Sequence, residues 1–150
     1  MLDLSKINEI INQLEILKCE IMELQEQIEN PEYIKLKQYL FENLAQVTND
    51  KYIGSVIFID NNNVKYITLN DLDSGDFNYI IYNNKAYDWY KREFYDDKLV
   101  IYYTEEYNIP ENIIMILKTI PESIISNAKY SHFKLYCLLK KNYKFEFVKV

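Results

Sequence analysis

The chain has 150 residues, of which 49% are hydrophobic and 27% charged, and its formal net charge at pH 7 is −6. This composition is typical of a globular protein and excludes a disordered chain, and no apolar run approaches the length that crosses a bilayer. The start, MLDLSKINEIINQ, lacks the basic and apolar regions of a secretory signal. We therefore expect a soluble protein that stays in the cytoplasm, of the host cell if a virus encodes it, with no membrane partner.

Residues 4–29 carry an unbroken heptad repeat, in which apolar side chains recur at alternating spacings of three and four. This pattern predicts an amphipathic helix that pairs with another helix through a coiled-coil seam of a and d positions. Leu4 and Ile11, at e positions, widen the stripe, which alternatively favours packing within the chain's own domain. We predict a homodimer or higher homo-oligomer; the g and e′ positions of a parallel pair are not complementary, so the orientation stays open. The heptad seam consists of Ile7, Ile10, Leu14, Leu17, Ile21, Leu24 and Ile28.

A second helix is predicted over residues 32–47, because Asn30 and Pro31 combine a stop signal with a new start signal. Continuing the first heptad frame past Pro31 would put polar residues on the seam. We therefore expect the chain to turn or kink there rather than to continue as one rod. On this basis residues 1–47 form a helical hairpin or coiled-coil arm, and residues 48–150 form an α+β domain.

The pattern then changes from helical to extended, and β-branched and aromatic residues gather in short runs. Polar turns rich in Asn and Asp separate these runs, and both residues tolerate the left-handed backbone best after Gly. Runs joined by such short turns predict an antiparallel meander. Its five strands are expected at residues 52–60, 64–69, 77–82, 85–95 and 99–106.

The C-terminal third is predicted to hold two short helices and a β-hairpin. Each helix opens on a proline, and the two are expected over residues 110–119 and 121–129. Residues 132–140 fit either a strand or a helical face. We prefer a strand, because residues 143–150 (YKFEFVKV) form a clear second strand and Lys140-Lys141-Asn142 suits the turn between them. The predicted fold class is therefore α+β.

The residue inventory excludes several kinds of active site. Gly54 and Gly75 are the only glycines, so no phosphate-binding loop with several fixed glycines can form. His132 is the only histidine, which excludes a multi-histidine metal site within one chain, and no motif supports a Ser/His/Asp triad through it. Cys19 and Cys137 form no C-x-x-C pair and are predicted to be reduced thiols. We expect no cofactor, no bound metal and no catalytic residues.

One acidic loop comes closer to a cation site. Asp71, Asp73 and Asp76 lie near one another in the sequence, and carboxylate oxygens are ligands for hard cations. The calcium-loop pattern requires an oxygen ligand fifth and Gly sixth, whereas here Gly75 is fifth and Asp76 sixth. A solvated turn is the preferred interpretation, and a metal-dependent enzyme that uses this loop is kept as an alternative function.

Nucleic-acid binding is disfavoured by charge, because the chain is acidic and Arg92 is its only arginine. The tail is the exception, since six lysines outnumber one glutamate there. Lysines on a terminal hairpin more often protect a sheet edge than bind an anion. A nucleic-acid or nucleotide binder that uses this lysine-rich hairpin is the second alternative function. The lysines are Lys129, Lys134, Lys140, Lys141, Lys144 and Lys149.

The run AYDWYKREFY carries aromatic side chains on both faces of a predicted strand. Strict alternation puts Tyr87, Trp89 and Tyr95 on one face and Ala86, Tyr90 and Phe94 on the other. Only one face of a small antiparallel sheet is easily covered by the chain's own helices, so the other should show aromatics to solvent. Tyr and Trp are favoured at the centres of protein interfaces. We predict partner contacts at Tyr87, Trp89, Tyr90 and Arg92.

The predicted function is a non-enzymatic interaction or inhibitor protein that self-associates through its first helix and binds an unidentified protein partner. Gly occurs 2 times and Tyr 15 times, beside abundant Ile, Asn and Lys. Such usage is typical of an AT-rich genome, which viruses, phages and other mobile elements often have.

Overall fold

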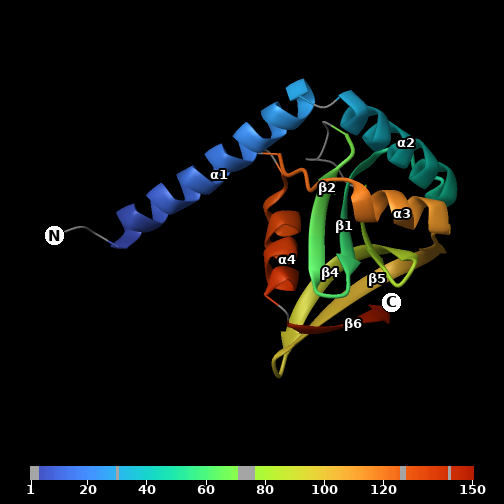
Figure 1. Cartoon of the computed structure of the whole chain (residues 1–150). Helices are drawn as coiled ribbons and strands as arrows, with labels where there is room; N and C mark the ends of the chain where they lie inside the picture. Colours follow the sequence, from blue (N-terminus) through green and yellow to red (C-terminus); the bar gives the residue numbers. More distant parts are fainter. Residues whose placement is uncertain (1–3, 30, 71–76, 126–127, 142) are drawn as a thin grey trace.

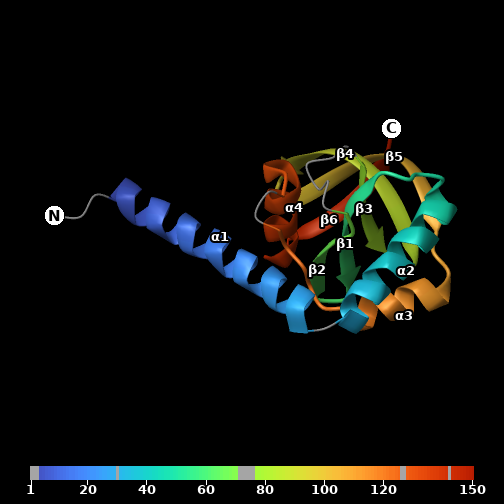
Figure 2. The same cartoon turned by 90° about the horizontal axis from the view of Figure 1, so that it is seen from above.

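The computed structural model describes residues 4–29, 31–70, 77–125, 128–141 and 143–150, and the side chains of these residues except 19–29 and 77. Within them, helices and a mixed sheet form the α+β fold predicted from the sequence, which is confirmed (Figures 1 and 2). The helices are α1 (Leu4–Glu29), α2 (Pro31–Thr48), α3 (Glu111–Thr119) and α4 (Tyr130–Lys140). The strands are β1 (Ile53–Asp60), β2 (Asn63–Thr68), β3 (Phe77–Tyr82), β4 (Lys85–Tyr95), β5 (Lys98–Asn108) and β6 (Lys144–Lys149).

The first two helices run in different directions, so the predicted turn at Pro31 is confirmed (Figure 1). α2 lies on the sheet and buries Tyr33, Leu40 and Leu44 in one cluster with α3. α1 instead projects from the body toward the N-terminus in both views (Figures 1 and 2). The division of the chain at residue 47 stays a prediction. In the described part of the chain, no helix combines the length and apolarity needed to cross a bilayer.

The sheet is mixed and has the strand order β2-β1-β3-β4-β5-β6. β1 pairs antiparallel with β2 but parallel with β3, so the predicted antiparallel meander is wrong at the step from β2 to β3. The physical reason lies in β1, which is apolar on both faces: Phe58 packs toward α2 and α3, and Ile57 packs toward α4. A strand that is buried on both faces belongs inside a sheet, with a neighbour on each edge.

The described residues between α3 and α4, 120–125 and 128–129, form no helix, so the helix predicted over residues 121–129 is wrong there. Ser123 forms a parallel bridge with Ile67 at the outer edge of β2. Its backbone N–H donates to the carbonyl of Tyr66 at 2.9 Å, and the N–H of Thr68 donates to the Ser123 carbonyl at 3.1 Å. This pairing satisfies backbone groups that the edge strand would otherwise leave open, which a helix could not do.

Residues 130–140 form α4, so the predicted strand at 132–140 and the C-terminal hairpin are wrong. The helix is favoured over the strand because it buries His132, Leu135 and Leu139 together on one side of α4. β6 is a strand as predicted, but it pairs parallel with β5 instead of folding back on a neighbouring hairpin strand.

Two hydrophobic clusters lie on opposite faces of the sheet, one under α2 and α3 and the other under α4. On the α4 side the sheet curls strongly. The ring centroid of Tyr82 on β3 lies 5.1 Å from that of Phe145 and 5.8 Å from that of Phe147, both on β6. Since β4 and β5 separate these strands in the sheet, such contacts require the sheet to wrap around α4.

Two hairpin turns use Asn and Asp in the left-handed region. The angle φ is 51° at Asn83 and 62° at Asn84, and it is 46° at Asp96 and 67° at Asp97. Positive φ at both central residues is the signature of a type I′ turn, whose twist matches that of the flanking strands. The prediction that Asn and Asp replace Gly in these turns is confirmed.

Replacing Asn84 with Gly is expected to raise the free energy of unfolding by about 0.5 kcal/mol, because Gly adopts a positive φ without the steric cost of a Cβ atom. Asn84→Ala should lower it by about 1 kcal/mol. Urea unfolding measures both changes, and Asn62→Ala, at an exposed turn position without positive φ, should change little. Equal effects of Gly and Ala at position 84 would contradict this account.

Candidate interaction surfaces

The described part of the heptad seam is open to solvent on α1. Ile7, Ile10, Leu14 and Leu17 expose 37%, 54%, 59% and 51% of their surfaces. The side chains of the remaining seam positions, Ile21, Leu24 and Ile28, lie outside the described residues. The four seam residues whose side chains are described therefore form an apolar face that the rest of the chain does not cover.

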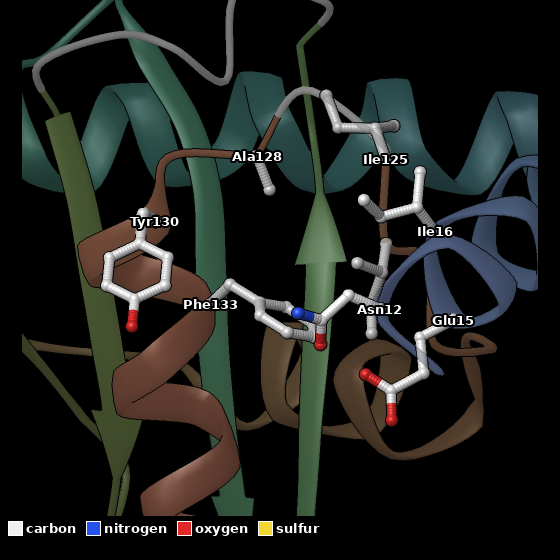
Figure 3. Close-up of a pocket in the computed structure, with 8 residues that line it drawn as sticks. Asn12, Glu15, Ile16, Ile125, Ala128, Tyr130 and Phe133 are labelled. Carbon is white, nitrogen blue, oxygen red and sulfur yellow. The ribbon is translucent and has the colours of Figure 1, made fainter. Parts of the chain in front are cut away.

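α1 turns a different face toward α4. Asn12, Glu15 and Ile16 of α1 line a cavity of about 380 Å³ together with Ile125 and Phe133. Figure 3 shows these side chains of α1 reaching toward the loop before α4 and the start of α4. They occupy f, b and c positions of the heptad, which lie across the helix from a and d. The seam therefore points away from the body, whereas a helix that packs only on its own domain turns its apolar stripe inward.

The groove between α1 and α4 continues into a polar end lined by Glu15, Lys18 and residues of α4. There the Tyr136 hydroxyl donates to the Glu122 carboxylate and accepts from Lys140 Nζ at 2.7 Å. Cys137 borders this end as a free thiol, and burial raises its pKa. A raised pKa keeps the thiol protonated and unreactive at neutral pH.

β4 carries a bulge that strict alternation does not predict. Trp89 pairs with Tyr103, and Lys91 pairs with Tyr102. Two residue steps on β4 thus match one step on β5, which makes Tyr90 the extra residue of the bulge.

Beyond the bulge the two faces of β4 are exchanged, so the predicted division of its aromatics between the faces is wrong for the last two. Phe94 lies on the α4 side, where its ring packs against Tyr143 at 5.4 Å between centroids. Tyr95 lies on the outer side with Tyr102. A bulge shifts the side-chain alternation by one residue, and that shift is the physical cause.

The structure does not bring the four predicted partner residues together on one surface. Tyr87 is 9% exposed and stacks on Phe147, with ring centroids 4.0 Å apart and planes within 5°. Trp89 packs toward α4 as well. Arg92 is half-buried, and its Nη1 donates to the carbonyl of Ser131 at 3.1 Å. Tyr90 alone of the four is exposed, at 50%.

The outer face of β4 and β5 carries an aromatic patch that we name the tyrosine surface. Lys91 Nζ lies 5.8 Å from the ring centroid of Tyr90 and 4.8 Å from that of Tyr102. It also lies 3.3 Å from a Glu93 carboxylate oxygen, and the Tyr95 hydroxyl donates to the same carboxylate. Hydrogen bonds from Tyr95 and Lys91 lower the pKa of Glu93. The charges on this patch are thus paired with each other. The tyrosine surface consists of Tyr90, Lys91, Glu93, Tyr95 and Tyr102.

A polar cluster is buried between the sheet and α4. Ser55 Oγ donates to Asn78 Oδ1, and Asn78 Nδ2 lies 3.3 Å from His132 Nε2. The Trp89 ring stands edge-on to His132 at 5.4 Å between centroids. Burial, with a smaller contribution from the charge of Lys129, lowers the pKa of His132 to about 4. The imidazole is therefore neutral at physiological pH and is held as part of the interior.

An acidic cavity of about 420 Å³ was not predicted from the sequence, because its lining residues come from four separate segments: residues 48–52, Tyr79, Asp88 and Tyr107. The hydroxyl of Tyr79 donates to Asp50 Oδ2 at 3.1 Å. Burial raises the pKa of Asp88, and the charges of Glu105 and Asp50 add to this effect. No short sequence motif joins these residues, so only the fold shows the cavity.

The predicted metal and anion sites have different outcomes. Asp71, Asp73 and Asp76 lie outside the described residues. Within the described ranges, no group of three or more His, Cys, Asp or Glu side chains is arranged to hold a metal ion. The six tail lysines are divided between α4 with its flanking residues and β6, so they do not share the face of one hairpin.

No family model, curated protein or solved structure matches this chain.

Proposed function

We propose that this chain is a non-enzymatic interaction protein that self-associates through α1 and binds a protein partner through the tyrosine surface. The observation that carries the proposal is the heptad seam, which is apolar at every a and d position and open to solvent wherever its side chains are described.

Physical chemistry supports a helix as the occupant of the seam. Fully burying one Leu or Ile side chain contributes roughly 1.5–3 kcal/mol of favourable free energy. A partner that covers the row of exposed Leu and Ile side chains on α1 would therefore be bound favourably. A helix that projects without tertiary contacts is marginal in water, because packing of its apolar face supplies most of its stability. A second helix with the same seam meets both needs through knobs-into-holes packing.

The tyrosine surface supports the second half of the proposal. Tyr90, Tyr95 and Tyr102 offer large apolar areas with hydroxyl groups, which interface centres favour. Lys91 and Glu93 neutralise each other, so the surface presents no net charge to attract phosphates. A protein partner fits such a surface better than a nucleic acid does.

The test of self-association is the double substitution Leu14→Asp/Leu17→Asp. We expect light scattering at tens of micromolar to show an oligomer for the natural chain and a monomer for this variant, because two charges at the seam cannot be desolvated. The matched control, Ser5→Asp/Asn8→Asp, adds the same charge at the same spacing on the f and b positions and should remain oligomeric.

Two results would overturn the proposal: a natural chain that is monomeric at these concentrations, or a seam variant whose mass is unchanged. Circular dichroism should show that both variants keep the folded body, because Leu14 and Leu17 are exposed in the single chain, while the monomeric seam variant loses part of the helical signal of α1.

A further inference from the structure

Three residue types occur once each in this chain, and the fold gathers all three at the first turn of α4. They are Trp89, Arg92 and His132, which we name the Trp-Arg-His cluster. The ring centroid of Trp89 lies 5.4 Å from that of His132. Arg92 Nη1 donates to the carbonyl of Ser131, the residue before His132, at 3.1 Å. β4 therefore supplies two members of the cluster and α4 supplies the third.

The bulge at Tyr90 places the two members from β4 on the same face of the strand. In a regular strand, residues 89 and 92 would point to opposite faces, because side chains alternate. The bulge shifts this alternation by one residue, so Arg92 joins Trp89 on the side of α4. Bulges are frequent beside functional sites, where they re-aim a side chain. The side chain redirected here is the only arginine of the chain.

The hydrogen bonds around His132 determine which of its ring nitrogens carries the proton. Asn78 Oδ1 accepts from Ser55 Oγ, and Asn78 Nδ2 lies 3.3 Å from His132 Nε2. The NH₂ group of an amide only donates, so Nε2 is the acceptor. Burial lowers the pKa of His132 to about 4, so at neutral pH the imidazole is neutral and holds one proton. That proton therefore lies on Nδ1.

The cluster holds two buried N–H donors. Among the residues that the structure describes, neither His132 Nδ1 nor Trp89 Nε1 has a hydrogen-bond partner, and both atoms are buried. His132 as a whole is only 8% exposed. A buried donor without an acceptor is costly, and native structures rarely contain one. Since the two rings are in contact, one small ligand with acceptor oxygens can serve both donors.

The charges near these donors favour an anion. Lys129 is the N-cap residue of α4, and its charge contributes to the lowered pKa of His132. The first turn of α4 contains no acidic residue and has no side-chain cap, so these residues do not offset the positive end of the helix dipole. In the described ranges, no carboxylate forms an ion pair with Arg92 or Lys129. A negatively charged ligand is therefore favoured over a neutral one.

The start of α4 is open to solvent. Lys129 is exposed, and Tyr130 exposes 74% of its surface. Arg92 is half-buried, and its guanidinium offers N–H groups besides the one that Ser131 accepts. This planar group matches the oxygens of a carboxylate or a phosphate. An oxyanion that reaches Arg92 from solvent would meet the guanidinium, the two ring N–H donors and the start of α4 together.

We infer that the Trp-Arg-His cluster binds a small oxyanion at the start of α4. The ligand group is a carboxylate or a phosphate, whose oxygens accept from the indole, the imidazole and the guanidinium. This inference is independent of the proposed self-association. It is also separate from the tyrosine surface, because Trp89 and Arg92 face α4 whereas the tyrosine surface lies on the other side of β4.

The fluorescence of Trp89 tests the site, because Trp89 is the only tryptophan and its indole N–H is one of the proposed donors. The natural chain is titrated with inorganic phosphate and, separately, with acetate, each compared with sodium chloride at equal ionic strength. We expect a saturable change in emission for at least one of the two oxyanions, beyond the change that chloride gives. The oxyanion that binds more tightly identifies the ligand group.

The substitution Arg92→Gln should weaken this binding about ten-fold, because it removes the guanidinium and its charge. The matched control is Lys91→Gln, which removes the same charge from the neighbouring residue on the outer face of β4. It should change the affinity by no more than about two-fold. Melting curves show whether Arg92→Gln remains folded. Lys129→Gln, at an exposed position, should weaken binding about three-fold and serves as the second test variant.

His132 provides a second readout, because it is the only histidine. Nitrogen-15 NMR of protein labelled at histidine identifies the ring nitrogen that carries the proton. We expect the proton on Nδ1, and we expect the bound oxyanion to shift the Nδ1 resonance more than the Nε2 resonance. The same shift should require a higher oxyanion concentration in Arg92→Gln.

Three results would overturn the inference. The first is the lack of a saturable response to either oxyanion at tens of millimolar. The second is binding that Arg92→Gln, or Lys129→Gln if the former unfolds, weakens no more than Lys91→Gln does. The third is a His132 proton on Nε2, since Nδ1 would then have no hydrogen to donate. A monomeric natural chain would overturn the proposed self-association and leave this site unaffected.

Discussion

Replacing Tyr87 with Ala is expected to lower the free energy of unfolding by about 3–5 kcal/mol, the range for removing a buried aromatic ring. The ring of Tyr87 stacks on Phe147 and also meets Tyr103 edge-on, with centroids 4.9 Å apart. These contacts join β4 to β6 across β5. Alanine at position 87 would leave a cavity between β4 and β6 and would remove the aromatic contacts that pack β6 against the curled sheet.

The matched control is Tyr90→Ala on the same strand. Its side chain is half-exposed on the outer face, so its removal should change the free energy of unfolding by no more than about 0.5 kcal/mol. Urea unfolding compares the two variants. Similar losses of stability in both would show that the outer tyrosines belong to the core and would contradict the tyrosine surface as a binding face.

Acidification from pH 7 to pH 4.5 is expected to destabilise the natural chain by about 2.5 kcal/mol more than a His132→Gln variant. The pKa of His132 is about 4 in the folded chain and 6.5 when it is exposed. Between pH 6.5 and pH 4, His132 is protonated in the unfolded chain but neutral in the folded chain. The free energy of unfolding therefore falls as the pH falls through this range. Above pH 7 this contribution is constant.

Gln at position 132 retains an acceptor for Asn78 Nδ2 but does not titrate. Urea unfolding at a series of pH values measures both slopes, and their difference isolates the imidazole from the carboxylates, which titrate in both proteins. Parallel pH profiles for the two proteins would show that His132 is solvated and would contradict its burial in the polar cluster.

Local rules predicted the parts of this fold that local interactions decide. The heptad pattern located α1 to the residue, Pro31 marked the change of direction, and the Asn and Asp pairs marked the two type I′ turns. In each case the residues that carry the pattern also form the structure. The heptad seam lies on one face of α1 and is exposed where its side chains are described, and its pairing with another helix stays a prediction.

The same local rules did not predict the features that depend on contacts between distant parts of the chain. The short polar connections predict a meander, and only the apolar character of β1 on both faces favours pairing of β3 with β1 instead of with β2. Residues 130–140 satisfy both periodicities, and only the packing of Leu135 and Leu139 under the curled sheet decides for a helix. The sequence gives no signal of the bulge at Tyr90 either, so strict alternation placed Phe94 and Tyr95 on the wrong faces of β4.

The closure of the β2 edge by Ser123 has a kinetic consequence. The hydroxyls of Thr68 and Ser123 lie 2.8 Å apart although 55 residues separate them, and the Tyr33 hydroxyl reaches the carbonyl of Pro121 across 88 residues. A hairpin such as β1–β2 forms in roughly 1–10 μs, whereas contacts of such high sequence separation must wait for the closure of long loops. During refolding, β2 therefore stands for a time as a formed strand with one unpaired edge. In that interval, which ends when α3 and the segment after it dock, the open edge of β2 is a site at which another chain can pair.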